Sequence, residues 1–136
     1  MTEEKTVTNE IIANKRYLIR GQKVMLDTDL AALYNLTNKS LMEQVKKNIK
    51  HFPAHFMFRL TETDLMVSKN EILSKKDFEG SLPFAFTGDG ILQLAQVLKG
   101  DCVMKMSIKI LVFNYLDGVF EKKESQKREK KLQAFL

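Results

Sequence analysis

The chain has 136 residues, of which 44% are hydrophobic and 29% charged, with only 6 glycines and 2 prolines. This composition is typical of one soluble globular domain and excludes disordered, collagen-like and disulfide-rich classes. The single cysteine, Cys102, cannot form an intrachain disulfide, so we expect a reducing, cytoplasmic location. No apolar run is long enough for a signal peptide or a membrane span.

The net charge of +5 and the isoelectric point of about 9.3 favour an acidic partner such as nucleic acid. The positive charge lies in two blocks. Residues 39–59 carry five basic and one acidic side chain, and residues 102–136 carry eight basic and four acidic ones, so each block has a net charge of +4. The rest of the chain is neutral or acidic.

The N-terminal part of the chain predicts an arm followed by a hairpin. Residues 1–16 lack a clear apolar period, so we expect a flexible N-terminal arm or a marginal helix. Residues 17–20 and 23–26 are two short extended runs, which predict a small β-hairpin with Gly21 first in a two-residue turn.

Two short helices follow, over about residues 28–35 and 39–50, joined by turn-forming residues. Carboxylates of Asp27 and Asp29 suit the first turn of the first helix. The second helix has an apolar side and ends before Pro53. The apolar residues of the second helix are Leu41, Met42, Val45 and Ile49.

The middle of the chain alternates between strands and helices. Residues 56–60 and 82–86 alternate in polarity and predict two paired strands. Between them, Thr61 and Asp64 form a capping-box pattern before the apolar residues Leu65, Met66, Ile72 and Leu73, and a mobile loop follows over residues 74–81. A further helix, capped by Thr87 or Asp89, ends at Gly100.

A last long helix is predicted to begin near Asp101, with apolar residues on two stripes. Such a helix is either wholly buried or shared between its own core and a partner chain, so a homodimer through residues 103–120 is one expected assembly. We expect a domain over residues 17–120 and a basic helical or flexible tail over 121–136. The stripes are Met104, Ile108, Leu111, Tyr115 and Val119, and Val103, Met106, Ile110, Phe113 and Phe120.

Together these elements predict an α+β fold with an N-terminal hairpin, a helix-turn-helix-like pair, a short antiparallel sheet and two C-terminal helices. The polar side of the second helix suits double-stranded DNA, because lysines neutralise phosphates while Gln, Asn and Ser address base edges. Basic residues of the hairpin and of residues 56–60 are expected to grip the flanking backbone as a wing does. The predicted DNA-binding residues are Lys39, Ser40, Gln44, Lys46, Lys47, Asn48, Lys50, Arg59, Arg20 and Lys23.

Five blocks of sequence then resemble the ORF-six N-terminal domain family of the KilA-N group, over about residues 17–100. They are residues 19–27 (IRGQKVMLD), 29–34 (DLAALY), 45–49 (VKKNI) with Phe52 and Pro53, 56–61 (FMFRLT) and 82–87 (LPFAFT). The resemblance implies a phage- or mobile-element-derived DNA-binding module with regulatory or antirepressor-like roles. It implies no enzymatic activity.

Other signals favour ordinary structural roles. His51 and His55 have a metal-like spacing, but Pro53 lies between them and no further ligand is near in sequence. Cys102 is expected to be a small buried hydrophobic residue. We find no coherent catalytic set and expect neither a cofactor nor a metal. The alternative function is a protein-interaction module, an antirepressor that binds a repressor through its two-sided last helix.

Overall fold

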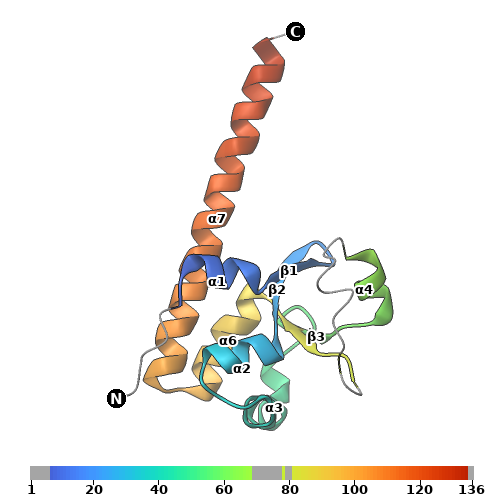
Figure 1. Ribbon diagram of the computed structural model, residues 1–136, viewed down its shortest axis with the longest axis vertical. Helices are drawn as coiled ribbons and strands as arrows, with labels where there is room; N and C mark the ends of the chain where they lie inside the picture. Colours follow the sequence, from blue (N-terminus) through green and yellow to red (C-terminus); the bar gives the residue numbers. More distant parts are fainter. Residues whose placement is uncertain (1–6, 69–77, 79–80, 135–136) are drawn as a thin grey trace.

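The computed structural model describes residues 7–68, 78 and 81–134 of the chain (Figure 1). Its helices pack with one antiparallel sheet, which confirms the expected α+β class. Its elements are α1 (Asn9–Asn14), β1 (Arg16–Ile19), β2 (Gln22–Leu26), α2 (Asp27–Leu33), α3 (Asn38–Lys47), the 3-10 turn η1 (Ile49–His51), β3 (Met57–Arg59), α4 (Glu62–Val67), β4 (Phe84–Phe86), α6 (Gly88–Leu98) and α7 (Asp101–Ala134).

The expected hairpin is confirmed, but its turn lies one residue earlier than predicted. Ile19 of β1 pairs with Gln22 of β2, so Arg20 and Gly21 form the turn. Both have positive φ, 53° for Arg20 and 73° for Gly21. This is the backbone of a type I′ turn, whose twist matches that of the strands. Gly21 therefore occupies the second turn position and not the first.

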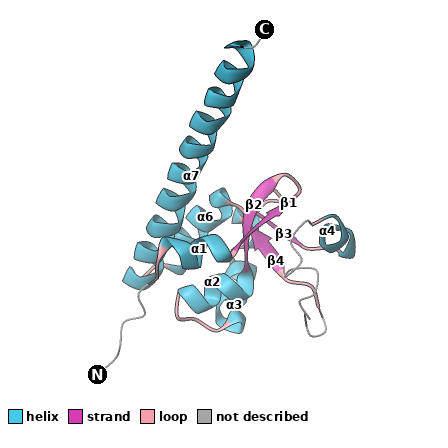
Figure 2. Ribbon diagram, turned by 45° about the horizontal axis from the view of Figure 1, so that its top comes forward, coloured by secondary structure: helices cyan, strands magenta, loops and turns pink. Residues whose placement is uncertain are grey.

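The strands form one antiparallel sheet in the order β1-β2-β4-β3 (Figure 2). The predicted pairing of the segments around β3 and β4 is confirmed, with Phe58 opposite Ala85. The hairpin belongs to the same sheet, because Met25 of β2 pairs with Phe86 of β4. The predicted hairpin and the predicted short sheet are thus a single element of the fold.

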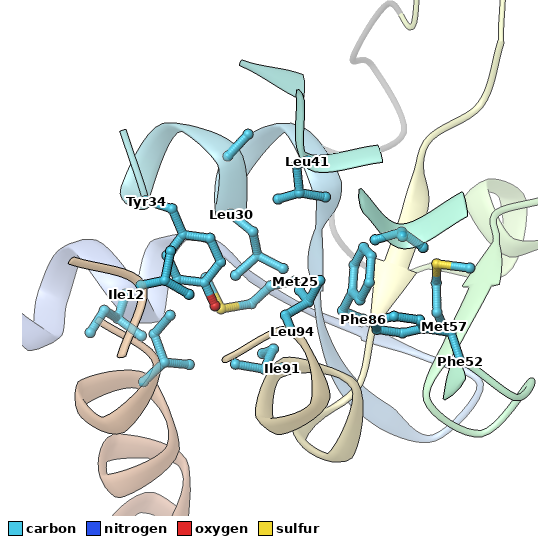
Figure 3. Packing of buried hydrophobic residues seen from close by; sticks show 14 residues of the cluster. Ile12, Met25, Leu30, Tyr34, Leu41, Phe52, Met57, Phe86, Ile91 and Leu94 are labelled. Carbon is cyan, nitrogen blue, oxygen red and sulfur yellow. The ribbon is translucent and has the colours of Figure 1, made fainter. Parts of the chain in front are cut away.

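Both faces of this sheet are covered by apolar side chains. Met25 packs in the larger cluster with the helices, whereas its neighbours Val24 and Leu26 pack in a second cluster. This follows from the two-residue period of a strand. In the larger cluster, Phe52 meets Phe86 edge-on at 6.1 Å between ring centroids (Figure 3).

Part of the expected N-terminal arm forms the helix α1, which packs on the rest of the domain. Its Ile12 is fully buried in the larger cluster, and the Thr8 hydroxyl accepts a hydrogen bond from the Ile11 amide at 3.2 Å. Of the two expectations for the N-terminal residues, the structure therefore shows the helix over residues 9–14, which Ile12 and the neighbouring Val7 pack against the core.

The capping box predicted for α4 is confirmed. The Thr61 hydroxyl accepts from the Asp64 amide at 3.2 Å, and the Asp64 carboxylate accepts from the Thr61 amide at 2.8 Å. The helix ends at Val67. Ile72, Leu73 and most of the loop expected over residues 74–81 lie outside the residues that the structure describes.

The helices α6 and α7 complete the larger core. Thr87 caps α6, because its hydroxyl accepts from the Gly90 amide at 3.3 Å. Val103 and Ile110 on the inner side of α7 are buried. The backbone of α7 stays helical to Ala134, and its C-terminal part runs well beyond the rest of the domain (Figures 1 and 2).

Candidate nucleic-acid interface

A lysine-rich side of α3 faces solvent. The helix begins after Thr37, whose hydroxyl accepts from the Ser40 amide at 3.0 Å. On its inner side, Leu41 and Val45 are fully buried, and they anchor α3 against α2 and α6. Because successive residues turn by about 100°, the opposite side points outward. The exposed residues of α3 on that side are Lys39, Ser40, Glu43, Lys46 and Lys47.

The second helix is shorter than predicted. It ends at Lys47, and the tighter turn η1 follows over Ile49–His51. The change from α-helical to 3-10 geometry rotates the side chains that come after it. Ile49 was expected on the buried side, but it is 52% exposed. Lys50, in the same turn, is also exposed.

Two of the predicted base-reading residues lie at the edge of this exposed side. Gln44 and Asn48 are half-buried. The side-chain amide of Asn48 donates to the backbone carbonyl oxygen of Gln44 at 2.9 Å. Asn48 therefore closes the last turn of α3, and that part of its hydrogen-bonding capacity is already in use.

The turn between α2 and α3 is held by buried contacts. Asn35 adopts a left-handed conformation with φ of 59°, which asparagine tolerates better than most residues. The hydroxyl groups of Tyr34 and Ser107 lie 2.8 Å apart and are hydrogen-bonded. Burial raises the pKa of Tyr34 to about 12, although the bond to Ser107 lowers it. The helix pair is thus joined to α7 at its turn.

The lysines around α3 form no ion pair with any of the described residues. In the described part of the chain, no carboxylate lies within ion-pairing distance of Lys39, Lys46, Lys47 or Lys50. The sequence contains no acidic residue over 44–61, and this stretch includes the exposed Arg59 of β3. The guanidinium carbon of Arg59 lies 4.7 Å from the centroid of the Phe84 ring.

Arg20 is not placed beside α3. Its guanidinium donates to both carboxylate oxygens of Asp64, at 3.0 and 2.9 Å, and lies 4.1 Å from the Phe58 ring centroid. These hydrogen bonds lower the pKa of Asp64. Both ribbon views show the hairpin turn near α4 and away from α3 (Figures 1 and 2).

Lys23 likewise faces another part of the fold. It forms an ion pair with Asp117 of α7, which also accepts from Arg16 at 3.1 Å. The hydrogen bond from Lys23, followed by that from Arg16, lowers the pKa of Asp117. The structure thus gathers the residues of α3 and η1 into one surface but does not bring Arg20 or Lys23 to it.

Helical spacing places Glu43 on the polar side of α3, and it is exposed there. One contact of the fold behind this helix was missed in the sequence. An added Cβ at Gly90 of α6 would lie 2.0 Å from the carbonyl oxygen of Phe56. No local signal in the sequence indicates this contact, because the two residues are far apart in the chain.

Cys102 is exposed, so the expectation that it is a buried hydrophobic residue is wrong. Its thiol lies 3.6 Å from the carbonyl oxygen of Tyr34. Among the described residues, no group of three or more His, Cys, Asp or Glu side chains is arranged to hold a metal ion. Within the same residues, no helix is both long and apolar enough to cross a membrane.

A lysine-rich helix presented by a helix-turn-helix-like pair beside a small sheet defines a class of regulatory, DNA-associated modules. Comparison with known families agrees with this class. The ORF6N domain model matches residues 14–97, and the chain belongs to this phage-type family. No curated protein and no solved structure gives a significant match.

Proposed function

We propose that the protein is a DNA-binding transcriptional regulator that places α3 in the major groove of double-stranded DNA. The observation that carries this proposal is the exposed lysine face of α3, whose cations have no carboxylate within ion-pairing distance in the described part of the chain. Cations without internal partners are available to neutralise phosphates and to release counterions. Membership of the ORF6N family supports the same function.

The residues divide into two groups by position. Lys39, Lys46, Lys50 and Arg59 are exposed and contact phosphates. Ser40, Gln44 and Lys47, together with Asn48, lie nearer to the base edges, where their donors and acceptors discriminate between base pairs. A flanking contact by Arg20 or Lys23 requires that their ion pairs with Asp64 and Asp117 open first.

The experiment is fluorescence anisotropy with random duplex DNA and with DNA from upstream of the protein's own gene, each titrated over salt concentration. Lys47→Ala and Gln44→Ala are expected to cost about 1–3 kcal/mol on the preferred site only. Lys46→Ala is expected to weaken binding to all duplexes and to reduce the salt slope by about one. Lys109→Ala, which removes a lysine of α7, is the matched control. Absence of binding to either duplex at low salt would overturn the proposal.

We propose further that the protein acts by binding alone and is not an enzyme. Its titratable groups with shifted pKa values support this. The pKa values of Asp64, Asp117 and Arg20 are shifted by ion pairs that join elements of the fold. Those of Tyr17 and Tyr34 are raised mainly by burial at packing contacts.

A protein-interaction role is the second candidate, and the outer side of α7 favours it. Ile108 and Tyr115 are large apolar residues that stay 53% and 70% exposed there. If the protein acts as an antirepressor, α7 and not α3 carries the activity. Substitution of Ile108 would then abolish function in cells while substitution of Lys47 would leave it intact, whereas loss of function on substitution of Lys47 supports DNA binding.

A further inference from the structure

The outer side of α7 is an apolar stripe directly opposite the side that packs on the core. Ser107 and Ile110 on the inner side are 1% and 0% exposed. At about 100° per residue, the centre of the outer side falls beside Val112, with Ile108 on its flank. The large exposed hydrophobic residues of this stripe are Met104 (45%), Ile108 (53%), Val112 (51%), Tyr115 (70%) and Leu116 (56%).

A stripe of this kind is a candidate interaction site, because contiguous exposed apolar surface of a few hundred Å² is often functional. Its five side chains expose on the order of 500 Å², and two copies together would bury about 1,000 Å², the lower limit for a specific interface. We propose that a second copy of the chain covers the stripe, with the two α7 helices antiparallel. Both ribbon views show the other helices and the sheet on one side of α7, which leaves the other side accessible (Figures 1 and 2).

The charges along the stripe determine the orientation. Asp101 and Lys105 lie on the same outer side as Ile108 and Val112, at the spacing of a helix-pair seam. A parallel pair would set Lys105 against its own copy and Asp101 against its own copy, and like charges in contact repel.

An antiparallel pair with its two-fold axis midway between Ile108 and Val112 avoids this repulsion. It sets Ile108 opposite Val112 of the other copy, and Lys105 opposite Tyr115. A lysine over a tyrosine ring is a favourable contact, and the interface is self-complementary, as two-fold symmetry requires.

The charge of the following segment leads to the same orientation. Residues 121–131 contain six basic and three acidic residues, and the backbone of α7 continues through them. Parallel helices would place these two basic segments side by side, whereas antiparallel helices direct them to opposite ends of the dimer. The net charge of each segment, +3, therefore disfavours the parallel pair.

Sedimentation equilibrium without DNA tests the association, independently of the proposed function. We expect a dimer with a micromolar dissociation constant, which Ile108→Lys weakens at least about tenfold. Leu92→Lys is the matched control, since Leu92 of α6 is 49% exposed but lies off the stripe. Circular dichroism melts confirm that both variants fold. A monomer at concentrations of tens of micromolar, or equal weakening by both variants, would overturn the proposal.

Disulfide trapping tests the orientation. In a Cys102→Ser background, one preparation carries Ile108→Cys and another carries Val112→Cys, and the two differ by an affinity tag. The antiparallel dimer gives a mixed disulfide when the two are combined and little product from either alone. Self-linking of each variant by itself would show a parallel pair and overturn the assigned orientation, as would equal yields of all products.

Discussion

Only glycine fits at position 90, because the backbone of Phe56 lies directly against it. A Cβ at this position would lie 2.0 Å from the carbonyl oxygen of Phe56, and a backbone atom cannot rotate away as a side chain can. We therefore predict that Gly90→Ala lowers the free energy of unfolding by about 2 kcal/mol or more, as overpacked sites do. Urea denaturation followed by circular dichroism measures this change.

Gly88 provides the control within the same helix. An added Cβ there meets only a methyl carbon of Leu111, at 4.0 Å. Alanine is the better helix former, so Gly88→Ala is expected to be neutral or to stabilise by up to about 1 kcal/mol. Equal destabilisation by the two substitutions would contradict this explanation, because helix propensity favours alanine at both positions and only Gly90 lies against the Phe56 backbone.

Asp64 makes the stability depend on pH. Hydrogen bonds from Arg20, and then from Thr61, hold the pKa of its carboxyl below its ordinary value of about 3.9. The charged form therefore stabilises the fold fully above this value, and the stabilisation is lost as the pH falls through the lower pKa of the folded state. We predict that Asp64→Asn costs about 1 kcal/mol at pH 7 and that the difference from the unsubstituted protein shrinks below about pH 4.

Denaturant titrations of both proteins between pH 7 and pH 2.5 test this dependence. Since Asp117 also has a lowered pKa, the Asp64→Asn variant is still expected to lose stability in acid, but by a smaller amount. A difference between the two proteins that stays constant down to pH 2.5 would assign the effect to the shape of the cap and not to its charge.

At the scale of elements, a buried hydrogen bond joins the α2–α3 turn to α7. Tyr34→Phe removes the partner of the Ser107 hydroxyl, which lies at a residue only 1% exposed. We predict a loss of about 1–2 kcal/mol for Tyr34→Phe, whereas adding Ser107→Ala to it costs little more, because both polar groups are then gone. A double-mutant cycle in urea measures the coupling, and strictly additive losses would contradict it.

Elements whose sequence carries a local signal were predicted correctly. The capping box of Thr61 and Asp64 and the cap at Thr87 are formed by residues close together in the chain, and both are confirmed. The hairpin turn was placed one residue late, because the sequence offered Gly21 but did not show that Arg20 shares its positive φ. The end of α3 was missed because the switch to η1 changes the helical period that had placed Ile49 on the buried side.

Across the whole molecule, contacts between residues far apart in the chain were harder to predict from the sequence than the placement of residues within one helix. The lysines of α3 share one helix, so their periodicity placed them on one exposed side. Arg20 and Lys23 were assigned to flanking backbone contacts as basic residues of a wing-like hairpin, yet their partners Asp64 and Asp117 lie 44 and 94 residues away. Which of several carboxylates a cation meets is decided by tertiary packing, and no local pattern encodes it.

The two proposals together predict how assembly changes DNA binding. A two-fold dimer presents two α3 helices and doubles the number of lysine–phosphate contacts on a duplex that carries two half-sites. Ile108→Lys should therefore bind such a duplex with about half the salt slope of the unsubstituted protein, while the two proteins bind a single half-site with equal slopes. Anisotropy titrations over salt concentration measure both slopes. Unchanged slopes in a variant shown to be monomeric would mean that each chain binds DNA alone, so that the pairing of α7 helices would have another purpose.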